Sequence, residues 1–168
     1  MNRQSVPAAP ELLAVDLGLR MGWAQYGANG RLLHYGAHNF GARKRLRNGC
    51  KWLLNRFPGT QWLVLEGGDA SSRVWKAEAE RRKIQTLHVG AETWREVLLP
   101  SGSPQTGAVA KGRADTLARS IIGWSEAKRP TTLRHDAAEA ICLGLWGVLE
   151  IGWLDEHPFS FPGPSQIL

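Results

Sequence analysis

Leu12-Leu13-Ala14-Val15-Asp16-Leu17-Gly18 is a short, almost wholly apolar run with one carboxylate near its carboxyl end. A run that is apolar on both faces is typical of a strand buried in the middle of a sheet. Asp16 would then lie where an ionised group is costly unless a cation pairs with it. No lysine or arginine lies within three residues of Asp16. The counter-charge is therefore expected from a distant basic side chain or from a metal ion.

Two further strands are expected to follow this one closely. A tight turn over Gly18 to Gly22 leads to a strand over 23–27, and a third strand is expected over 31–40. Ala28-Asn29-Gly30 between them is a hairpin signal of the Asn-Gly type. Strands joined this tightly form an antiparallel meander.

The rest of the chain predicts two parallel strands and a series of helices. A crossover through a helix should be right-handed, which lays the strand ending at Glu66 parallel to the first strand. An α/β fold follows, with a five-stranded mixed sheet of three antiparallel and then two parallel strands, and helices on both faces. The expected ranges are helix 42–57, strand 62–66, helix 70–83, strand 84–89, helix 92–98, loop 100–112, helix 113–128 and a last helix from about 133 to about 149.

Length and composition indicate one domain. The 168 residues are enough for a full core, which we place over 11–151. Residues 1–10 lack the apolar run of a secretion signal and are expected to form a flexible tail, and the proline-rich residues 152–168 an irregular one. No window is apolar for the length of a membrane span. Cys50 and Cys142 fall in separate helical patterns, which predicts two free thiols in a reducing cytoplasm.

Charge is distributed unevenly along the chain. The net charge is +6, yet all 21 lysines and arginines and ten of the 15 acidic residues precede residue 135, and the other five acids follow it. The body is therefore strongly basic and the last segment acidic. A basic body favours a polyanionic partner, most often nucleic acid, although a basic surface without any partner has the same composition.

Four acidic residues occupy positions that suggest a shared site. Asp16 and Glu66 each end a buried strand, so parallel neighbours would hold them about 5 Å apart. Two carboxylates this close repel, and one stays protonated unless a divalent cation binds both. Asp136 and Glu139 are three residues apart and share one face of the last helix. A stripe of small residues would let that helix pack close to the sheet: Ala137, Ala140, Gly144 and Gly147.

Each acid also has an ordinary structural interpretation. Asp16 could cap a turn, Asp136 could favour the start of a helix, and Glu139 could be solvated. The conjunction of two strand-end acids with a helical pair, in this order, is less easily accidental.

This ordered set resembles the RuvC-like Holliday junction resolvases, which have the ribonuclease H-like fold. The resemblance covers roughly residues 12–150 and lies in Val15-Asp16-Leu17-Gly18, Leu65-Glu66-Gly67 and His135-Asp136-Ala137-Ala138-Glu139-Ala140. Glu92-Thr93-Trp94-Arg95 and Lys111-Gly112-Arg113-Ala114-Asp115 also look like family segments. The opening motif is weak, the closing block is moderately strong, and the ordered set is stronger than either.

The resemblance implies a catalytic metal centre. Its ligands would be Asp16, Glu66, Asp136 and Glu139, holding two Mg²⁺ ions about 4 Å apart, with Mn²⁺ as a substitute. One ion would activate water for attack on a phosphodiester and the other would stabilise the leaving oxygen. His135 is either a weaker ligand or proton carrier, or simply structural, and Asp69 is a less favoured extra ligand.

The chain departs from the family in two places. Only about 17 residues separate Glu66 from Ile84, where the family has a longer helical stretch that helps to form its dimer. A homodimer is still expected, with its usual surface in doubt. The family often has an aromatic residue soon after the strand-end glutamate, whereas Trp75 is the nearest one here. Trp75 is interpreted as a packed side chain rather than a base-stacking one.

Basic residues on the helices are candidates for contacts with DNA phosphates, although charge runs on helices are usually solvated faces. Nothing resembles a base-reading helix, so we expect recognition of DNA shape before sequence. Lys111 and Arg113 match basic family positions near the phosphate. The candidate set is Arg43, Lys44, Arg45, Arg47, Lys51, Arg73, Lys76, Arg81, Arg82, Lys83, Lys111 and Arg113.

The predicted function is a Mg²⁺-dependent endodeoxyribonuclease that resolves four-way (Holliday) junctions in DNA recombination and repair. The alternatives are a ribonuclease H or other nuclease on the same fold, and a non-catalytic protein that binds branched DNA. An actin-like ATPase also opens on an Asp-x-Gly strand, but 168 residues leave no room for its second lobe. The expected location is the cytoplasm, at the nucleoid, or the host cytoplasm if the gene is viral.

Overall fold

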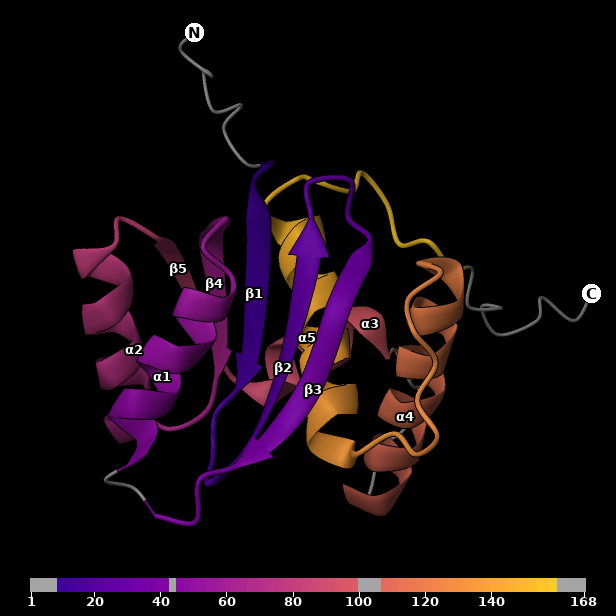
Figure 1. The fold of residues 1–168 in the computed structure, drawn as a ribbon. Coiled ribbons are helices and arrows are strands. Elements are labelled where there is room, and N and C mark those ends of the chain that lie inside the picture. Colours follow the sequence, from indigo (N-terminus) through magenta and orange to yellow (C-terminus); the bar gives the residue numbers. More distant parts are fainter. Residues whose placement is uncertain (1–8, 43–44, 100–106, 160–168) are drawn as a thin grey trace, which may run out of the picture.

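The computed structural model describes residues 9–42, 45–99 and 107–159. A five-stranded mixed sheet lies between two groups of helices (Figure 1). Its strands are β1 (Glu11–Asp16), β2 (Arg20–Gly27), β3 (Leu32–Asn39), β4 (Thr60–Glu66) and β5 (Gln85–Val89), in the order β3-β2-β1-β4-β5. The helices are α1 (Leu46–Arg56), α2 (Asp69–Arg81), α3 (Ala91–Leu98), α4 (Gly107–Trp124) and α5 (His135–Glu150).

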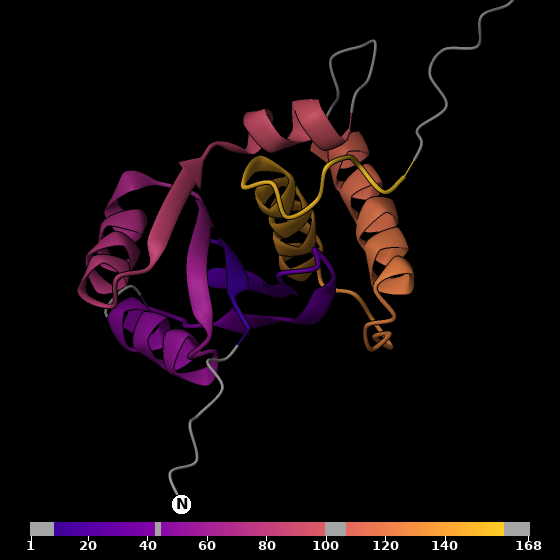
Figure 2. The ribbon, with the colours of Figure 1, turned by 90° about the horizontal axis from the view of Figure 1, so that it is seen from above.

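The predicted topology is confirmed. Strands β1, β2 and β3 pair antiparallel, and β1, β4 and β5 pair parallel. Helices cover both faces of the sheet, with α1 and α2 on one side and α3, α4 and α5 on the other (Figure 2). No helix among the described residues is long and apolar enough to cross a lipid bilayer.

The start of α4 corrects one expectation. Residues 100–112 were expected to form a loop, but α4 already begins at Gly107; residues 100–106 lie outside the described part. The first turn of α4 faces solvent and buries no side chain. The periodic apolar residues that predict a helix are therefore missing from this turn. Ala108 and Ala110 favour the helix there despite Gly107 and Gly112.

Alternation along β1 divides the interior into two cores. Leu12 and Ala14 point to the core shared with α3, α4 and α5, and Leu13 and Val15 to the core shared with α1 and α2. All four are fully buried, as the apolar run predicts for a central strand. Cys142 lies in the first core and Cys50 in the second, and both are free thiols, as expected.

Helix α5 is the centre of the larger core. All its residues from Ala137 to Val148 are buried, and it packs on β1 and β2. The small residues allow a close approach, since a Cβ at Gly144 would lie 2.2 Å from the Tyr26 ring and one at Gly147 would lie 2.7 Å from Val64. The Tyr26 hydroxyl donates a 2.6 Å hydrogen bond to the carbonyl of Ile141. The helix is therefore fixed both in depth and along its axis.

The segment after α5 returns to this core. Residues 152–159 form no helix or strand, yet Trp153, Leu154 and Phe159 pack against it. Leu154 fills the space beside Gly30 at the β2–β3 turn. Residues 152–159 thus cover the end of the core opposite the carboxyl end of β1.

Candidate active site

The carboxyl ends of β1 and β4 lie side by side. Asp16 is directly opposite Glu66 on one side and Gly22 on the other, in a row that continues to Ala37 in β3 and Val89 in β5. Side chains alternate between the two faces of a strand. Asp16 therefore shares a face with Leu12 and Ala14, and Glu66 shares a face with Val64, and this face packs against α5. The two strand-end carboxylates therefore face the helix that carries the other two acids.

Gly22 lets α5 reach this row. A Cβ built on Gly22 would lie 1.8 Å from the Asp136 carbonyl oxygen and 2.3 Å from its carbonyl carbon. The first turn of α5 therefore rests directly on the β2 backbone beside Asp16. The close approach predicted from the small-residue stripe is present, and it places Asp136 and Glu139 at the strand ends.

Burial and mutual repulsion perturb the strand-end acids. The pKa of Asp16 is raised from 3.8 to about 8, first by burial and then by the nearby charges of Glu66, Glu139 and Asp136. Burial also raises the pKa of Glu66, and Glu139 adds to that effect. Each of the other three acids thus acts electrostatically on Asp16, so the four carboxyl groups share one neighbourhood. A cation at this point would favour their ionised forms.

Helix α3 supplies the polar partners of two of the acids. The Trp94 indole nitrogen donates a 2.6 Å hydrogen bond to Glu66 Oε2, and the indole is fully buried. The Arg95 guanidinium forms an ion pair with Glu139 and lowers the pKa of both Asp16 and Glu66. No role for Trp94 or Arg95 was predicted beyond a likeness to a family segment. The available signal was their position on a short helix that directly follows β5, at the same edge as the acids.

Two residues at the start of α5, Arg134 just before the helix and His135 as its first residue, lie close to the helical acids. His135 Nε2 lies 3.4 Å from Glu139 Oε2, and Arg134 lies 4.0 Å from Asp136 Oδ2. His135 is thus beside the acids, where either of its suggested roles can be tested. Asp69 is exposed at the first residue of α2, after the strand-end Glu66 and Gly67-Gly68. Trp75 is 1% exposed, as expected for a packed side chain.

The donor set fits a hard divalent cation. It consists of carboxylates, which Mg²⁺ prefers, and Asp16 makes no hydrogen bond or ion pair with any described residue. As the side chains lie, no three histidine, cysteine, aspartate or glutamate side chains among the described residues are gathered closely enough to hold an ion. Arg95 already pairs with one oxygen of Glu139, so that oxygen is not available to a metal ion in this arrangement.

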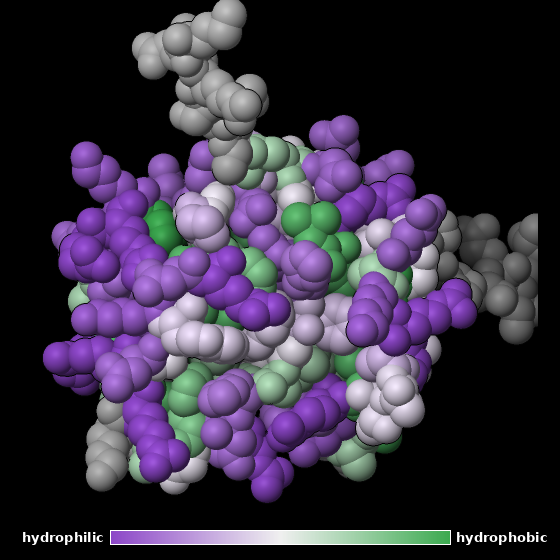
Figure 3. All heavy atoms as spheres, viewed as in Figure 1, coloured by the Kyte–Doolittle hydropathy of each residue, from purple (hydrophilic) through white to green (hydrophobic). Residues whose placement is uncertain are grey.

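The predicted phosphate-binding residues are spread over three helices. Arg45, Arg47 and Lys51 are exposed on or beside α1, and hydrophilic side chains cover the α1–α2 side of the molecule (Figure 3). Lys111 and Arg113 lie in the first two turns of α4, which starts at the same end of the molecule as α5 (Figure 1). Arg73 and Lys76 are exposed on α2, where Lys76 Nζ lies 2.9 Å from His88 Nδ1. Arg43 and Lys44 lie outside the described residues.

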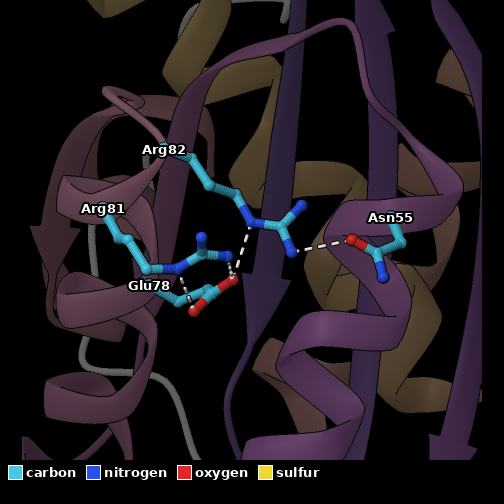
Figure 4. Close-up of polar contacts among 4 residues, drawn as sticks. All are labelled: Asn55, Glu78, Arg81 and Arg82. Atoms are coloured by element: carbon cyan, nitrogen blue, oxygen red, sulfur yellow. Dashed lines mark hydrogen bonds and ion pairs between the residues drawn. The ribbon is translucent and has the colours of Figure 1, made fainter.

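Arg81, Arg82 and Lys83 lie elsewhere. They lie at the carboxyl end of α2 and lead into β5, so they are near the amino ends of the parallel strands, whereas the acids are near the carboxyl ends. Arg81 and Arg82 both bind the Glu78 carboxylate, and Arg82 also donates a 2.7 Å hydrogen bond to Asn55 Oδ1 of α1 (Figure 4). This network joins the two helices. The structure does not bring these residues to the acids, and a DNA contact there stays a prediction.

The fold is that of a known class of α/β proteins. The chain is similar to the structure of RuvC from Thermus thermophilus, with a TM-score of 0.60 and 17% sequence identity, over 84% of this chain and 96% of that one. At this identity the likeness shows a shared fold, and it confirms the five-stranded mixed sheet with helices on both faces. No family model matches the chain, and no curated protein matches it by sequence.

Proposed function

We propose that the protein is a divalent-metal-dependent nuclease that cuts branched DNA, with the four-way junction as its preferred substrate. The observation that carries the proposal is geometric: Asp16 lies opposite Glu66 in the sheet register, and the first turn of α5, which carries Asp136, rests on Gly22 beside Asp16. Buried like charges of this kind are costly to a fold and are typical of sites that bind a cation. The RuvC fold and the basic body of the chain support the choice of DNA as substrate.

In this proposal Asp16, Glu66, Asp136 and Glu139 would hold two Mg²⁺ ions, with Mn²⁺ able to replace them. The ions would supply the water activation and the charge stabilisation that phosphodiester hydrolysis requires. Trp94 fixes one oxygen of Glu66 and leaves the other free for a ligand. The exposed cations Lys111, on α4, and Arg45 and Arg47, at the start of α1, would hold the phosphates of the incoming strands.

The test is a comparison of binding and cleavage in single-residue variants. Asp136→Asn keeps the size of the side chain and removes its charge, so it should bind a synthetic four-way junction and cleave it at background level in Mg²⁺. Asp155→Asn is the matched control, because Asp155 is exposed in residues 152–159, which cover the end of the core opposite the carboxyl end of β1. The control should cleave like the wild type. Cleavage by Asp136→Asn at the wild-type rate would show that the site is elsewhere.

Substrate choice separates the related alternatives. The wild type should cleave a four-way junction faster than a linear duplex or an RNA–DNA hybrid. Preference for the hybrid would identify a ribonuclease H, and binding of the junction with no cleavage in Mg²⁺ or Mn²⁺ would identify a non-catalytic binding protein. A homodimer acting in the cytoplasm completes the proposal, and light scattering of the purified protein with and without junction DNA tests its oligomeric state.

A further inference from the structure

A hollow lies on the other face of the sheet, near the strand ends that carry the acids. His38 and Phe40 at the end of β3, and Arg45, Asn48, Gly49 and Trp52 of the α1 segment, line a hollow of about 390 Å³. This volume is within the range of small-molecule sites. None of these residues takes part in the acidic site described above.

The hollow is built from aromatic rings. The His38 ring lies 4.7 Å from the Phe40 ring and 5.6 Å from the Trp52 ring, centroid to centroid. Phe40 is buried because Gly49 leaves room for it, since a Cβ on Gly49 would lie 2.2 Å from the Phe40 ring. Trp52, in contrast, is 45% exposed. Nearly half of the Trp52 surface is thus open to solvent beside rings that are already packed.

Charge and hydrogen-bonding groups around the rings indicate the class of ligand. Arg45 and Asn48 line the hollow, whereas Arg47 and Lys51 of the same segment line a separate hollow between α1 and α2. Helix α1 contains no acidic residue. Aromatic faces that stack on bases, beside cations that pair with phosphates, are the combination by which proteins bind single-stranded nucleic acid. An apolar peptide would make no use of Arg45, and the test below distinguishes a base from a second copy of the chain.

The position of the hollow relates it to the acids. Ala37 belongs to the same row across the sheet as Gly22, Asp16 and Glu66, and His38 is the next residue along β3. Strands β3 and β1 are separated only by β2, which is about 10 Å between their axes. A nucleic-acid strand that crosses this edge of the sheet could therefore reach both places within a few nucleotides.

We propose that this hollow holds one unpaired base of the nucleic acid, stacked on Trp52, while the strand's backbone continues toward the acids. The proposal rests on the proposed function for the identity of the ligand. It goes beyond it by assigning a base-holding site on the α1 face of the sheet. A branched substrate would supply such a base by unpairing one nucleotide at its crossover, at a cost in pairing and stacking energy.

The test is a double-mutant cycle on binding, measured without divalent metal so that cleavage has no part in it. Fluorescence anisotropy would compare a duplex carrying one unpaired thymine with the same duplex carrying an abasic residue at that position, for the wild type and for Trp52→Ala. Removal of the base should weaken binding by the wild type about 5- to 150-fold and binding by Trp52→Ala less than about 2-fold. Leu33→Ala is the control, because Leu33 is 40% exposed on the same edge strand at its other end, and it should behave like the wild type.

Equal effects of base removal in the wild type and in Trp52→Ala would overturn the proposal, as would a wild type that does not distinguish the two DNAs. Trp52→Leu repeats the cycle with an apolar side chain that has no ring, so a folding defect of the alanine variant does not leave the question open. A dimer that dissociates in Trp52→Ala, with base removal acting equally in both proteins, would assign the hollow to a second copy of the chain. Failure to bind any DNA would instead refute the proposed function itself.

Discussion

Asp16→Asn should make the metal-free protein more stable at high pH while it abolishes cleavage. The carboxyl group of Asp16 has a pKa of about 8 in the fold and 3.8 in the unfolded chain. Between these values the folded state keeps a proton that the unfolded state releases, so the stability of the metal-free protein falls as the pH rises. The full contribution is present below pH 3.8 and is lost as the pH passes through about 8.

The magnitude follows from the slope of this dependence. Each pH unit within the window costs about 1.4 kcal/mol, so a rise from about pH 5 to about pH 8 costs the wild type up to about 4 kcal/mol through this one group. Asparagine does not titrate and has no such cost. For a chain of this size that difference corresponds to about 10 °C in Tm. The two proteins should therefore differ more at pH 8 than at pH 5, in favour of the variant.

The assay is thermal or urea unfolding in EDTA at several pH values. Glu80→Gln is the control, because it removes one negative charge from an exposed position on α2 and so measures the effect of net charge alone. Mg²⁺ should then raise the Tm of the wild type by mass action, and raise it less in Asp16→Asn. A flat difference between wild type and Asp16→Asn from pH 5 to pH 8 would refute the reasoning, since Asp16 would then be neither buried nor repelled as described.

Two other substitutions test how the acids are positioned. Gly22→Ala places a methyl group against the Asp136 backbone, which cannot move aside. The variant should be less stable by about 3 kcal/mol or more, and it should cleave more slowly at temperatures where it is folded. Urea unfolding at wild-type stability would contradict the packing of α5 on β2. Trp94→Phe keeps an aromatic ring and removes the hydrogen-bond donor to Glu66. It should lower the free energy of unfolding by about 1–3 kcal/mol and weaken Mg²⁺ binding measured by calorimetry. If both values are unchanged, the hydrogen bond has no influence on the site.

The parts of the site that were predictable from sequence are those that depend on periodicity. The apolar run of β1 predicts a central strand, and a central parallel pair places Asp16 beside Glu66, as their register confirms. The small residues of α5 predict a close approach, which Gly144 and Gly147 show. Each of these features follows from a pattern within one stretch of the sequence, so its prediction does not require contacts with distant residues to be known.

The parts that escaped prediction depend on contacts between distant segments. The pairing of Arg95 with Glu139 joins residues on different helices, and no periodicity specifies it. Gly22 appeared only as a turn residue, although its missing side chain admits α5. The i,i+4 spacing of Glu78 and Arg82 is compatible with the ion pair that they form, whereas the charge of Arg82 suggests a DNA contact. Composition does not distinguish a cation that closes an internal network from one that faces a ligand.

Arg95 partly offsets the negative charge of the acidic residues at the strand ends. Its guanidinium pairs with Glu139 and lowers the pKa of Asp16 and Glu66, yet its Nε is buried and has no hydrogen-bond partner among the described residues. A buried donor without a partner costs free energy, so attraction to the carboxyl groups must offset that cost. The pKa of Asp16 stays raised in the presence of Arg95, first because the carboxyl group is buried and then because Glu66, Glu139 and Asp136 repel its charge. In the proposed function, a divalent cation bound at the strand ends would favour the ionised forms of these carboxyl groups.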